Sequence, residues 1–411
     1  MSEDLLQQIQ TLQFSDKHQA EVLLKSFIHE MFDLDIVSVE LRPLAVSLNS
    51  FNGFIQLATG RRLFFKTHTE PDNVIGEYYH ATLLSEVGYP VIQPVYSSTE
   101  ASKQLLIYEV IDDPSVFDAA WAIECGTETQ LESLTRAQHE ADKHLFELYM
   151  ASLHQQPAEE AAEAAVHQLF YHRLTGGRLA RFYDNTDIHL PAGVFPMAEI
   201  RRAQWQINGQ HYAMTLDDLI AQAIDLLHPA QSGPAIIGHG DAHNGNVFFN
   251  AEAAKLTYFD PAFAGKHHPL LDLTKPLFHN IFAMWMYFPA EKKAQTSIEM
   301  VQLADNHWSV TYDYPLHPVR EMFLDSKVRH TLIPILAHLK AAGILRADWR
   351  TFLKAALFCC PFLTMNLADS AKFPPEISLL GLVMAVEMGA ESAGTLSRID
   401  RLLNEIEQQL G

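Results

Sequence analysis

The chain has 411 residues, of which 48% are hydrophobic, and its formal net charge is −21 at pH 7. This length can bury a core in two lobes or two domains. The acidic balance argues against a nucleic-acid partner, which requires clustered Lys and Arg. Three cysteines cannot build a disulfide framework, and neither the start Met1–Asp4 nor the apolar stretch Ile377–Val386 predicts a signal peptide or a membrane span. We therefore expect a cytoplasmic protein without a membrane partner, whose oligomeric state the sequence leaves unknown.

The first third of the chain combines strand patterns with one helix. The helix covers Val74–Val87 with Glu77 in its first turn, and Lys66 ends the second arm of a hairpin that turns at Thr59-Gly60. Lys66 and Glu77 could form an ion pair, although a solvated Lys and a Glu favoured by the helix dipole explain each residue alone. Strands are predicted at Val37–Leu41, Phe54–Ala58, Arg62–Lys66, Val91–Tyr96 and Gln104–Ile111.

The middle of the chain is predicted to be mainly helical. A helix covers Thr135–His154, a hairpin over Trp205–Tyr212 turns at an Asn-Gly pair, and Thr215 caps a helix that runs to Leu227. Three arginines in this region could recognise an anionic group, but their helical spacing equally suits a solvated helix face, which we favour. These arginines are Arg173, Arg178 and Arg181.

A polar loop between buried strands is the most informative segment. It runs from His239 to Asn246, after a strand at Ala235–Ile237 and before one at Val247–Phe249. A further strand at Leu256–Phe259 ends at Asp260, so we expect Asp260 to lie near Asp241 and Asn246. A tight turn could use the same residue types, but it requires neither the interval from Asp241 to Asn246 nor the later Asp.

The remaining chain, from Leu270 to the end, has helical periodicity throughout. We expect helices at Ser326–Leu339 and Thr395–Leu410. Asp272 stands where a helix begins, a position that favours a carboxylate in any protein.

The loop residues suit phosphoryl transfer, in which the barrier falls mainly through alignment and neutralisation of phosphate charge. One carboxylate must accept the proton of the acceptor hydroxyl. An amide oxygen and a second carboxylate must hold Mg²⁺, which prefers hard oxygen ligands. His-x-Asp-x-His could instead serve as a zinc ligand set in a metal hydrolase, although no other His cluster at metal-site spacing completes it.

The pattern His-x-Asp-x-x-x-x-Asn, followed by a strand-end Asp, resembles the kinase catalytic loop. Gly240 stands for the usual Arg, and Pro261-Ala262 for the usual Phe-Gly. This variant resembles the aminoglycoside phosphotransferase and choline kinase family, the small-molecule branch of the protein-kinase-like fold. The resemblance implies a two-lobed α+β fold with a nucleotide-binding lobe at 1–111, a small antiparallel sheet plus one helix. It implies a large, mainly helical lobe at 112–411 for catalysis and substrate binding, in which 157–214 is the specificity insertion.

The resemblance also implies roles for individual residues. Asp241 is the catalytic base, Asn246 and Asp260 hold Mg²⁺, and Lys66, held by Glu77, contacts the phosphates of ATP. The supporting residues are His239, which braces the loop backbone, His243, for which packing is favoured over contact with the acceptor, and Asp272, which supports the loop. Further nucleotide contacts are expected from Ser50, Asn52 and Gly53 at the phosphates and from the backbone of Glu109 to Ile111 at the adenine.

We therefore expect an ATP- and magnesium-dependent kinase that phosphorylates a hydroxyl group of a small molecule. An amine is the less favoured acceptor. The acidic chain could attract a cationic acceptor, although solubility explains the charge as well. Three questions stay open: the identity of the acceptor, whether ATP or GTP is the donor, and whether the biological role is antibiotic resistance or metabolism. A kinase-like nucleotide-binding or scaffold protein without transfer activity is the alternative, and the intact set of site residues argues against it.

Overall fold

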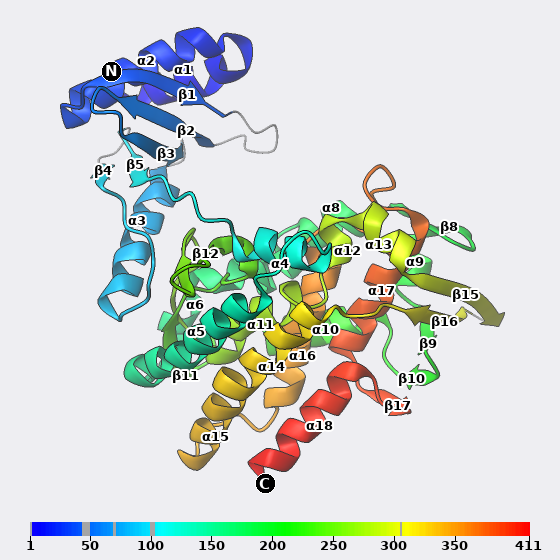
Figure 1. Ribbon diagram of the computed structural model, residues 1–411. Helices are drawn as coiled ribbons and strands as arrows, with labels where there is room; N and C mark the ends of the chain where they lie inside the picture. The colour runs from blue at the N-terminus through cyan, green and yellow to red at the C-terminus, as the bar shows by residue number, and fades with distance from the viewer. Residues whose placement is uncertain (1, 43–49, 69–70, 99–102, 305) are drawn as a thin grey trace. The chain divides into compact units, whose positions relative to one another are not determined.

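The computed structural model describes residues 2–42, 50–68, 71–98, 103–304 and 306–411 (Figure 1). Of these, the side chains of residues 2–4, 50, 68, 71–78 and 304 lie outside the described part. The chain forms two compact units. Unit 1 comprises Met1–Pro114 and Thr257–Ala262, and unit 2 comprises Ser115–Leu256 and Phe263–Gly411.

Unit 1 is built on an antiparallel five-stranded sheet with the order β1-β2-β3-β5-β4. Apolar side chains of the sheet, among them Ile55, Phe65 and Ile107, pack against Leu24 and Phe27 of the N-terminal helices to form its core. The elements are α1 (Ser2–Ser15), α2 (Lys17–Phe32), β1 (Ile36–Leu41), β2 (Ser50–Leu57), β3 (Arg62–His68), α3 (Pro71–Glu86), β4 (Tyr96–Ser98) and β5 (Leu105–Glu109).

The two N-terminal helices are absent from the sequence expectations. The Asp16 side chain accepts a hydrogen bond from Gln19 N and caps α2, which ends where Asp33 has a left-handed φ of 51°. Buried Leu24, Phe27 and Ile28 lie three and four residues apart, so they share one helix face. This spacing and the Asp16 cap are the signals that could have revealed α2.

Two expectations for unit 1 are wrong in detail. The segment Val91–Tyr96 is not a strand: Val91 makes an isolated bridge and β4 begins only at Tyr96. Pro90 and Pro94 lack the backbone N–H that a strand ladder requires, which accounts for the difference. The helix α3 begins at Pro71 rather than Val74, which places Glu77 beyond the first turn.

A short segment far along the sequence completes unit 1. Tyr258 N donates to Pro90 O at 2.8 Å, and Ile92 N donates to Tyr258 O at 2.9 Å. The Tyr258 ring also meets the Tyr89 ring edge-on, with 5.9 Å between the ring centroids. These contacts attach Thr257–Ala262, including Asp260, to the sheet unit.

Unit 2 is mainly helical. Its first elements are α4 (Val116–Glu124), α5 (Leu131–Ser152), β6 (His154–Gln156), α6 (Ala158–Ala162), η1 (Ala165–Leu169), α7 (Tyr171–Thr175), α8 (Arg178–Tyr183), β7 (Asp187–Leu190), β8 (Gly193–Pro196), α9 (Met197–Ile200), β9 (Gln204–Ile207), β10 (Gln210–Tyr212), α10 (Leu216–Leu226), β11 (Gly233–Gly238), η2 (Asn244–Asn246) and β12 (Val247–Asn250). After β13 (Lys255–Tyr258) follow β14 (Gly265–His267), α11 (Pro269–His279), α12 (Met284–Tyr287), α13 (Pro289–Gln295), β15 (Ser297–Ala304), β16 (His307–Asp313), α14 (Pro318–Lys327), η3 (Val328–Leu332), α15 (Ile333–Ala341), α16 (Trp349–Leu363), α17 (Pro375–Gly389), β17 (Ser392–Gly394) and α18 (Arg398–Leu410).

The core of unit 2 surrounds the helices α16 and α17, which pack against each other and are buried over most of their length. Within α16, Cys359 and Cys360 are buried, as expected for core packing. No helix in the described part of the chain has the length and apolar character needed to cross a membrane.

Local signals place two elements of unit 2 as predicted. The β9–β10 hairpin turns at Asn208 and Gly209, whose φ values of 49° and 79° fit a two-residue turn that requires left-handed backbone. Thr215 and Asp218 form a reciprocal capping box at the start of α10.

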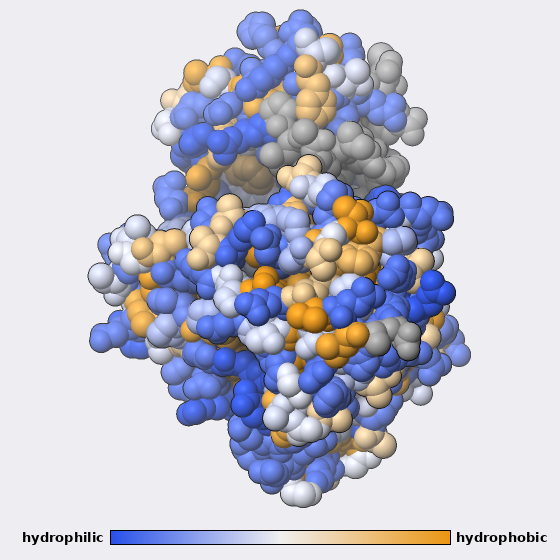
Figure 2. All heavy atoms as spheres, turned by 90° about the vertical axis from the view of Figure 1, so that its right-hand side faces the viewer, coloured by the Kyte–Doolittle hydropathy of each residue, from blue (hydrophilic) through white to orange (hydrophobic). Residues whose placement is uncertain are grey.

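Helical structure throughout the segment after Leu270 is a wrong expectation. The strands β15 and β16 pair there and join β9, β10 and β17 in a five-stranded sheet. Figure 2, which faces the right-hand side of Figure 1, shows apolar residues among the polar surface. Three large apolar side chains are exposed: Val301 and Leu303 of β15, and Val194 of β8. β15 is an edge strand that pairs with β16, and β16 pairs in turn with distant β9, a partner that a local pattern does not identify.

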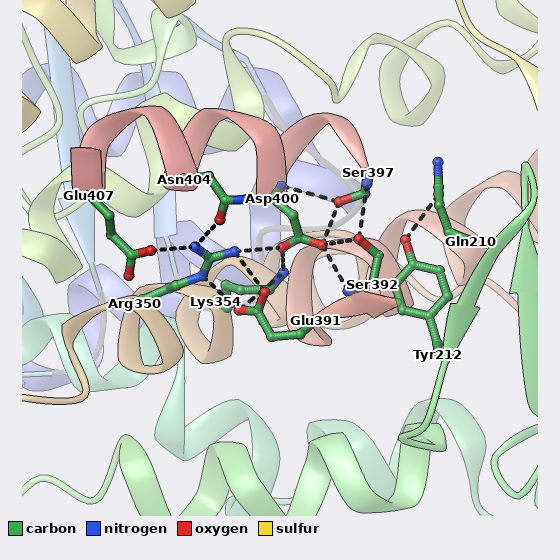
Figure 3. Close-up of polar contacts among 10 residues, drawn as sticks. All are labelled: Gln210, Tyr212, Arg350, Lys354, Glu391, Ser392, Ser397, Asp400, Asn404 and Glu407. Atoms are coloured by element: carbon green, nitrogen blue, oxygen red, sulfur yellow. Dashed lines mark hydrogen bonds and ion pairs between the residues drawn. The ribbon is translucent and has the colours of Figure 1, made fainter. Parts of the chain in front are cut away.

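A C-terminal ion cluster joins α16, β17 and α18 (Figure 3). Arg350 Nε and Nη2 donate to Glu391 at 2.9 and 2.7 Å, and Nη1 donates to Asn404 and Glu407 at 2.6 and 2.9 Å. Buried Lys354 pairs with Asp400, whose second oxygen accepts from Ser392 and Ser397. Every charged group of the C-terminal ion cluster therefore has at least one charged partner.

Candidate active site

The loop between β11 and β12 carries the residues expected to transfer phosphate. Gly240 has a φ of +77°, and a Cβ atom there would clash with the carbonyl oxygen of Phe263. A side chain at this position would require both strained backbone and displacement of Phe263. The glycine that replaces the usual kinase Arg is thus dictated by the path of this loop.

Asp241 and Asn246 lie together at the two ends of the loop. Asn246 Nδ2 donates to the backbone oxygen of Asp241 at 2.9 Å, which fixes the side-chain amide and leaves its Oδ1 atom on the opposite side. Asp241 Oδ1 is buried and has no hydrogen-bond partner within the described residues. The pair thus presents one carboxylate oxygen and one amide oxygen, each able to accept a hydrogen bond or bind a hard cation.

Asp272 of α11 anchors the loop from beneath. Gly240 N donates to Asp272 Oδ1 at 2.6 Å, His267 Nε2 lies 3.0 Å from the same oxygen, and Tyr149 donates to Oδ2. Burial alone would raise the pKa of Asp272. The hydrogen bond and charge of His267, together with the hydrogen bonds from Tyr149 and Gly240, lower it instead. An ionised, buried Asp272 therefore holds the backbone one residue before Asp241.

The two loop histidines differ in environment. His239 is completely buried. His243 Nδ1 accepts a hydrogen bond from Gly245 N at 3.0 Å, and its Nε2 atom lies 3.9 Å from Asp241 Oδ2, too far for a hydrogen bond. His243 therefore caps the short helix η2, while its ring stays within reach of the Asp241 carboxylate.

In unit 1, Lys66 and Asp260 form the second pair of predicted site residues. Lys66 Nζ lies 3.0 Å from Asp260 Oδ1, and 24% of the Lys66 side chain and 43% of the Asp260 side chain are exposed. Asp260 has a φ of 55°, a conformation that a residue other than Gly adopts only when its surroundings enforce it. The expected partner Glu77 has its side chain outside the described residues.

The remaining nucleotide candidates lie in unit 1 as well. Ser50, Asn52 and Gly53 belong to β2, which begins at Ser50 rather than at Phe54, where the sequence analysis began this strand. Asn52 pairs with Lys66 across the sheet, so both side chains project from the same face. Gly53 has a packing reason, because a Cβ atom there would clash with Glu40 O. The Glu109 side chain pairs with Arg61, and Ile111 follows the end of β5.

Two buried cations near Asp241 were misjudged from the sequence. A solvated face is wrong for Arg173, whose Nε and Nη1 atoms are buried, and for half-buried Arg178, which donates to Leu363 O at 3.3 Å; only Arg181 is exposed. Lys275 of α11 is 3% exposed and was not singled out. A lysine inside an otherwise apolar helix face was the signal that could have identified it.

A pocket of about 210 Å³ in unit 2 is distinct from the loop. Its lining includes His167, His267, Arg346 and Phe352. None of the lining residues is one of the predicted phosphate-handling residues, so we do not assign phosphoryl transfer to this pocket.

The sequence matches the family model described as the phosphotransferase enzyme family (APH) over residues 47–292. The chain belongs to this family. The predicted family and the kinase-like α+β fold class are confirmed, and the chain is a small-molecule kinase. Family membership, rather than a zinc site, accounts for the His-x-Asp-x-His loop. Among the described residues, no group of three or more His, Cys, Asp or Glu side chains could hold a metal ion.

The chain is also similar to several solved structures. A spectinomycin phosphotransferase in complex with ADP and spectinomycin is 14% identical, with 89% of this chain and 98% of that chain covered and a TM-score of 0.42. A putative fructosamine-3-kinase from Thermobifida fusca is 13% identical, with 89% and 97% covered and a TM-score of 0.42. The Plasmodium vivax ethanolamine kinase is 9% identical, with 96% and 89% covered and a TM-score of 0.44. No curated protein matches the sequence.

Proposed function

We propose that this phosphotransferase moves the γ-phosphate of ATP to a hydroxyl group of a small molecule, with Asp241 as the catalytic base. The acceptor oxygen forms a bond to phosphorus as the bond to the leaving ADP breaks, and Asp241 takes the hydroxyl proton. The products are ADP and a phosphate monoester. The observation that carries this proposal is the buried Asp241 Oδ1 atom, which has no hydrogen-bond partner within the described residues in a loop of this family.

The surroundings of Asp241 support this role. Asn246 binds its backbone oxygen, and Asp272 binds the adjacent Gly240 N, so the loop is fixed on both sides of the base. Fixing the base in advance reduces the reorganisation that proton transfer requires. Asp272 thus acts as a positioning residue.

The donor set fits Mg²⁺. Asn246 offers an amide oxygen, because its nitrogen is already used, and Asp260 offers a carboxylate in an enforced backbone conformation. Bound Mg²⁺ would neutralise phosphate charge. We assign Asn246 and Asp260 as its ligands on the family resemblance and on this donor chemistry.

The nucleotide contacts are proposed for unit 1. Lys66, on the same sheet face as Asn52, is assigned to the ATP phosphates, and the backbone from Glu109 to Ile111 to the adenine. Ser50 and Gly53 of β2 are assigned to the phosphates, and Glu77 to Lys66.

Transfer and binding can be separated by two substitutions. Asp241→Asn should strongly slow ADP release with a hydroxyl acceptor while calorimetry still detects Mg-ATP binding, because the base contributes to the reaction and not to nucleotide affinity. Asp260→Asn should weaken Mg-ATP binding as well. Exposed Asp225→Asn is the matched control and should match wild type.

The outcome also tests the alternative. A nucleotide-binding protein without transfer activity would bind Mg-ATP yet release no ADP with any acceptor in a broad panel of alcohols and amines. Equal turnover of wild type and Asp241→Asn would remove Asp241 from the role of base.

A further inference from the structure

Behind the loop, Lys275 is a charged group in a buried hydrogen-bond chain. Its Nζ atom lies 3.3 Å from His279 Nε2, and His279 Nδ1 lies 2.9 Å from the Tyr287 hydroxyl. Since an ammonium only donates, Nε2 accepts, and the Nδ1 proton points to Tyr287. Burial and then the positive charge of Lys275 hold the pKa of His279 well below its usual value, so His279 is neutral. The chain gives Lys275 a hydrogen-bond acceptor but no negative charge.

Arg173 brings a second positive charge to the same place. The helix α16 packs against both α7, which carries Arg173, and α11, which carries Lys275. Burial lowers the pKa of Lys275, and the charge of Arg173 lowers it further, so the two cations act on each other. We call Arg173, Lys275 and Asp241 the acceptor cluster.

One carboxylate faces these two cations. The negative charge of Asp241 acts on both Arg173 and Lys275. The charge of Arg173 also interacts with Cys359, Cys360 and Tyr287, and burial raises the pKa of each, so all three are uncharged at neutral pH. The buried amine of Lys275 and the partly buried guanidinium of Arg173 against one negative charge are a costly balance unless a further anion is bound.

The hydrogen-bonding groups point to the same conclusion. Arg173 Nε and Nη1 are buried and have no hydrogen-bond partner among the described residues, and no other arginine there has two such nitrogens. Nε and Nη1 lie on different edges of the guanidinium, so each can donate a separate hydrogen bond to an oxygen of a carboxylate or a phosphate. Asp241 Oδ1, the orphaned acceptor in the same cluster, matches a hydroxyl.

We propose that the phosphate acceptor is an anionic hydroxy compound, whose hydroxyl binds Asp241 and whose carboxylate or phosphate group binds Arg173 beside Lys275. This inference rests on the proposed function and names its substrate class. It replaces the cationic acceptor that the net charge of the chain suggested. Arg173 lies in the segment 157–214 expected to set specificity, whereas Lys66 in unit 1 is the cation assigned to ATP.

Matched pairs of acceptors test the charge. Hydroxycarboxylates of increasing length (glycolate, glycerate, 4-hydroxybutyrate and gluconate) are compared with ethylene glycol, glycerol, 1,4-butanediol and sorbitol, and glucose 6-phosphate with glucose. ADP release and calorimetric binding are measured for wild type, Arg173→Gln and the exposed control Arg181→Gln. At least one anion should bind wild type more tightly than its neutral counterpart. Arg173→Gln should weaken binding of that anion by about 10- to 100-fold, because charge-assisted hydrogen bonds are lost. Arg181→Gln should weaken its binding by less than about 3-fold.

The possible outcomes are distinguishable. If Arg173→Gln weakens binding of Mg-ATP rather than binding of the anionic acceptor, the acceptor cluster binds the nucleotide and the inference is wrong. If no organic anion binds, sulfate is the remaining probe: equal sulfate affinity of wild type and Arg173→Gln overturns the anion site, and tighter binding to wild type supports it. If anions bind with the expected Arg173 dependence but no ADP is released, the proposed function fails and the anion site stands.

Discussion

Two pairs of cations in unit 2 have the same chemistry and opposite surroundings. In the C-terminal ion cluster, Arg350 and Lys354 are matched by Glu391, Asp400 and Glu407, and Arg350 uses its Nε, Nη1 and Nη2 atoms. In the acceptor cluster, Arg173 and Lys275 face Asp241 alone, and two nitrogens of Arg173 lack partners within the described residues.

The difference separates two uses of buried charge. A saturated cluster fixes α18 against α16, and removing a member leaves an uncompensated charge inside the protein. An unsaturated cluster costs stability when the protein is empty and regains that free energy when an anion binds. Whether the hydrogen bonds are satisfied, rather than which residue types are present, distinguishes a structural cluster from one that binds a ligand.

The largest effect is expected for the carboxylate of the acceptor cluster. Asp241→Asn should lower kcat by about 10²- to 10⁴-fold, the range of general-base catalysis, while the protein stays folded. Rate measurements at saturating acceptor, together with circular dichroism, check this. A variant that unfolds instead would place Asp241 with the structural carboxylates.

Asp400→Asn should act in the opposite way. It leaves Lys354 buried beside a neutral group, so unfolding in urea should show a loss of about 3 to 5 kcal/mol, while kcat of the folded fraction is unchanged. Asp325→Asn, in an exposed pair with Arg329, is the control and should change stability by less than about 1 kcal/mol. A loss below 1 kcal/mol for Asp400→Asn would contradict the saturated-cluster reading.

Acid should affect His279, the hydrogen-bond partner of Lys275, and the C-terminal ion cluster in different pH ranges. His279 has a folded pKa well below 6.5, so it stays neutral in the folded protein and binds its proton on unfolding. Stability is therefore lost as pH falls below 6.5. Asp400, with its pKa lowered to about 2, contributes stability above 3.8 that disappears only as pH falls toward 2.

A thermal scan between pH 7.5 and 4.5 tests this order. The positive charges that act on His279 are those of Lys275, His243 and Arg173, all of which disfavour its protonation, and its Nδ1 atom faces the Tyr287 hydroxyl. His279→Asn keeps an acceptor for Lys275 and a donor for Tyr287, so it should flatten the dependence of Tm on pH. An unchanged slope would show that other groups control it, such as buried His167 with a pKa lowered to about 4.

The smallest effect is expected at the rim of the C-terminal ion cluster. Glu407→Gln removes a partner that is 45% exposed, and Arg350 keeps Glu391, Asn404 and Asp400. Redundant, solvated pairs contribute little, so the change should be about 0.5 kcal/mol or less by urea unfolding. A loss above 2 kcal/mol would mean that the cluster has no redundancy.

The sequence predicted what local signals encode. The strands around the loop of Asp241, the β2–β3 and β9–β10 hairpins and the Thr215 cap each follow from residues close in sequence. The helices α1 and α2 and the strands β15 and β16 were missed. Of these strands, β16 pairs with β9 from another part of the chain, a partner that local spacing does not show. The burial of Arg173 and Lys275 depends on α16, far along the chain, so spacing alone assigned Arg173 to solvent.

The attachment of Tyr258 to Pro90 and Ile92 has a consequence for synthesis and dissection of the protein. The chain passes between the two units not only after Pro114 but again on each side of Thr257–Ala262. A nascent chain that ends at Pro114 lacks Tyr258, which forms a bridge with Val91, and Asp260, which pairs with Lys66. Unit 1 therefore reaches its final form only after much of unit 2 has left the ribosome. Expression of the amino-terminal portion alone should yield a sheet without Asp260, the carboxylate that meets its lysine.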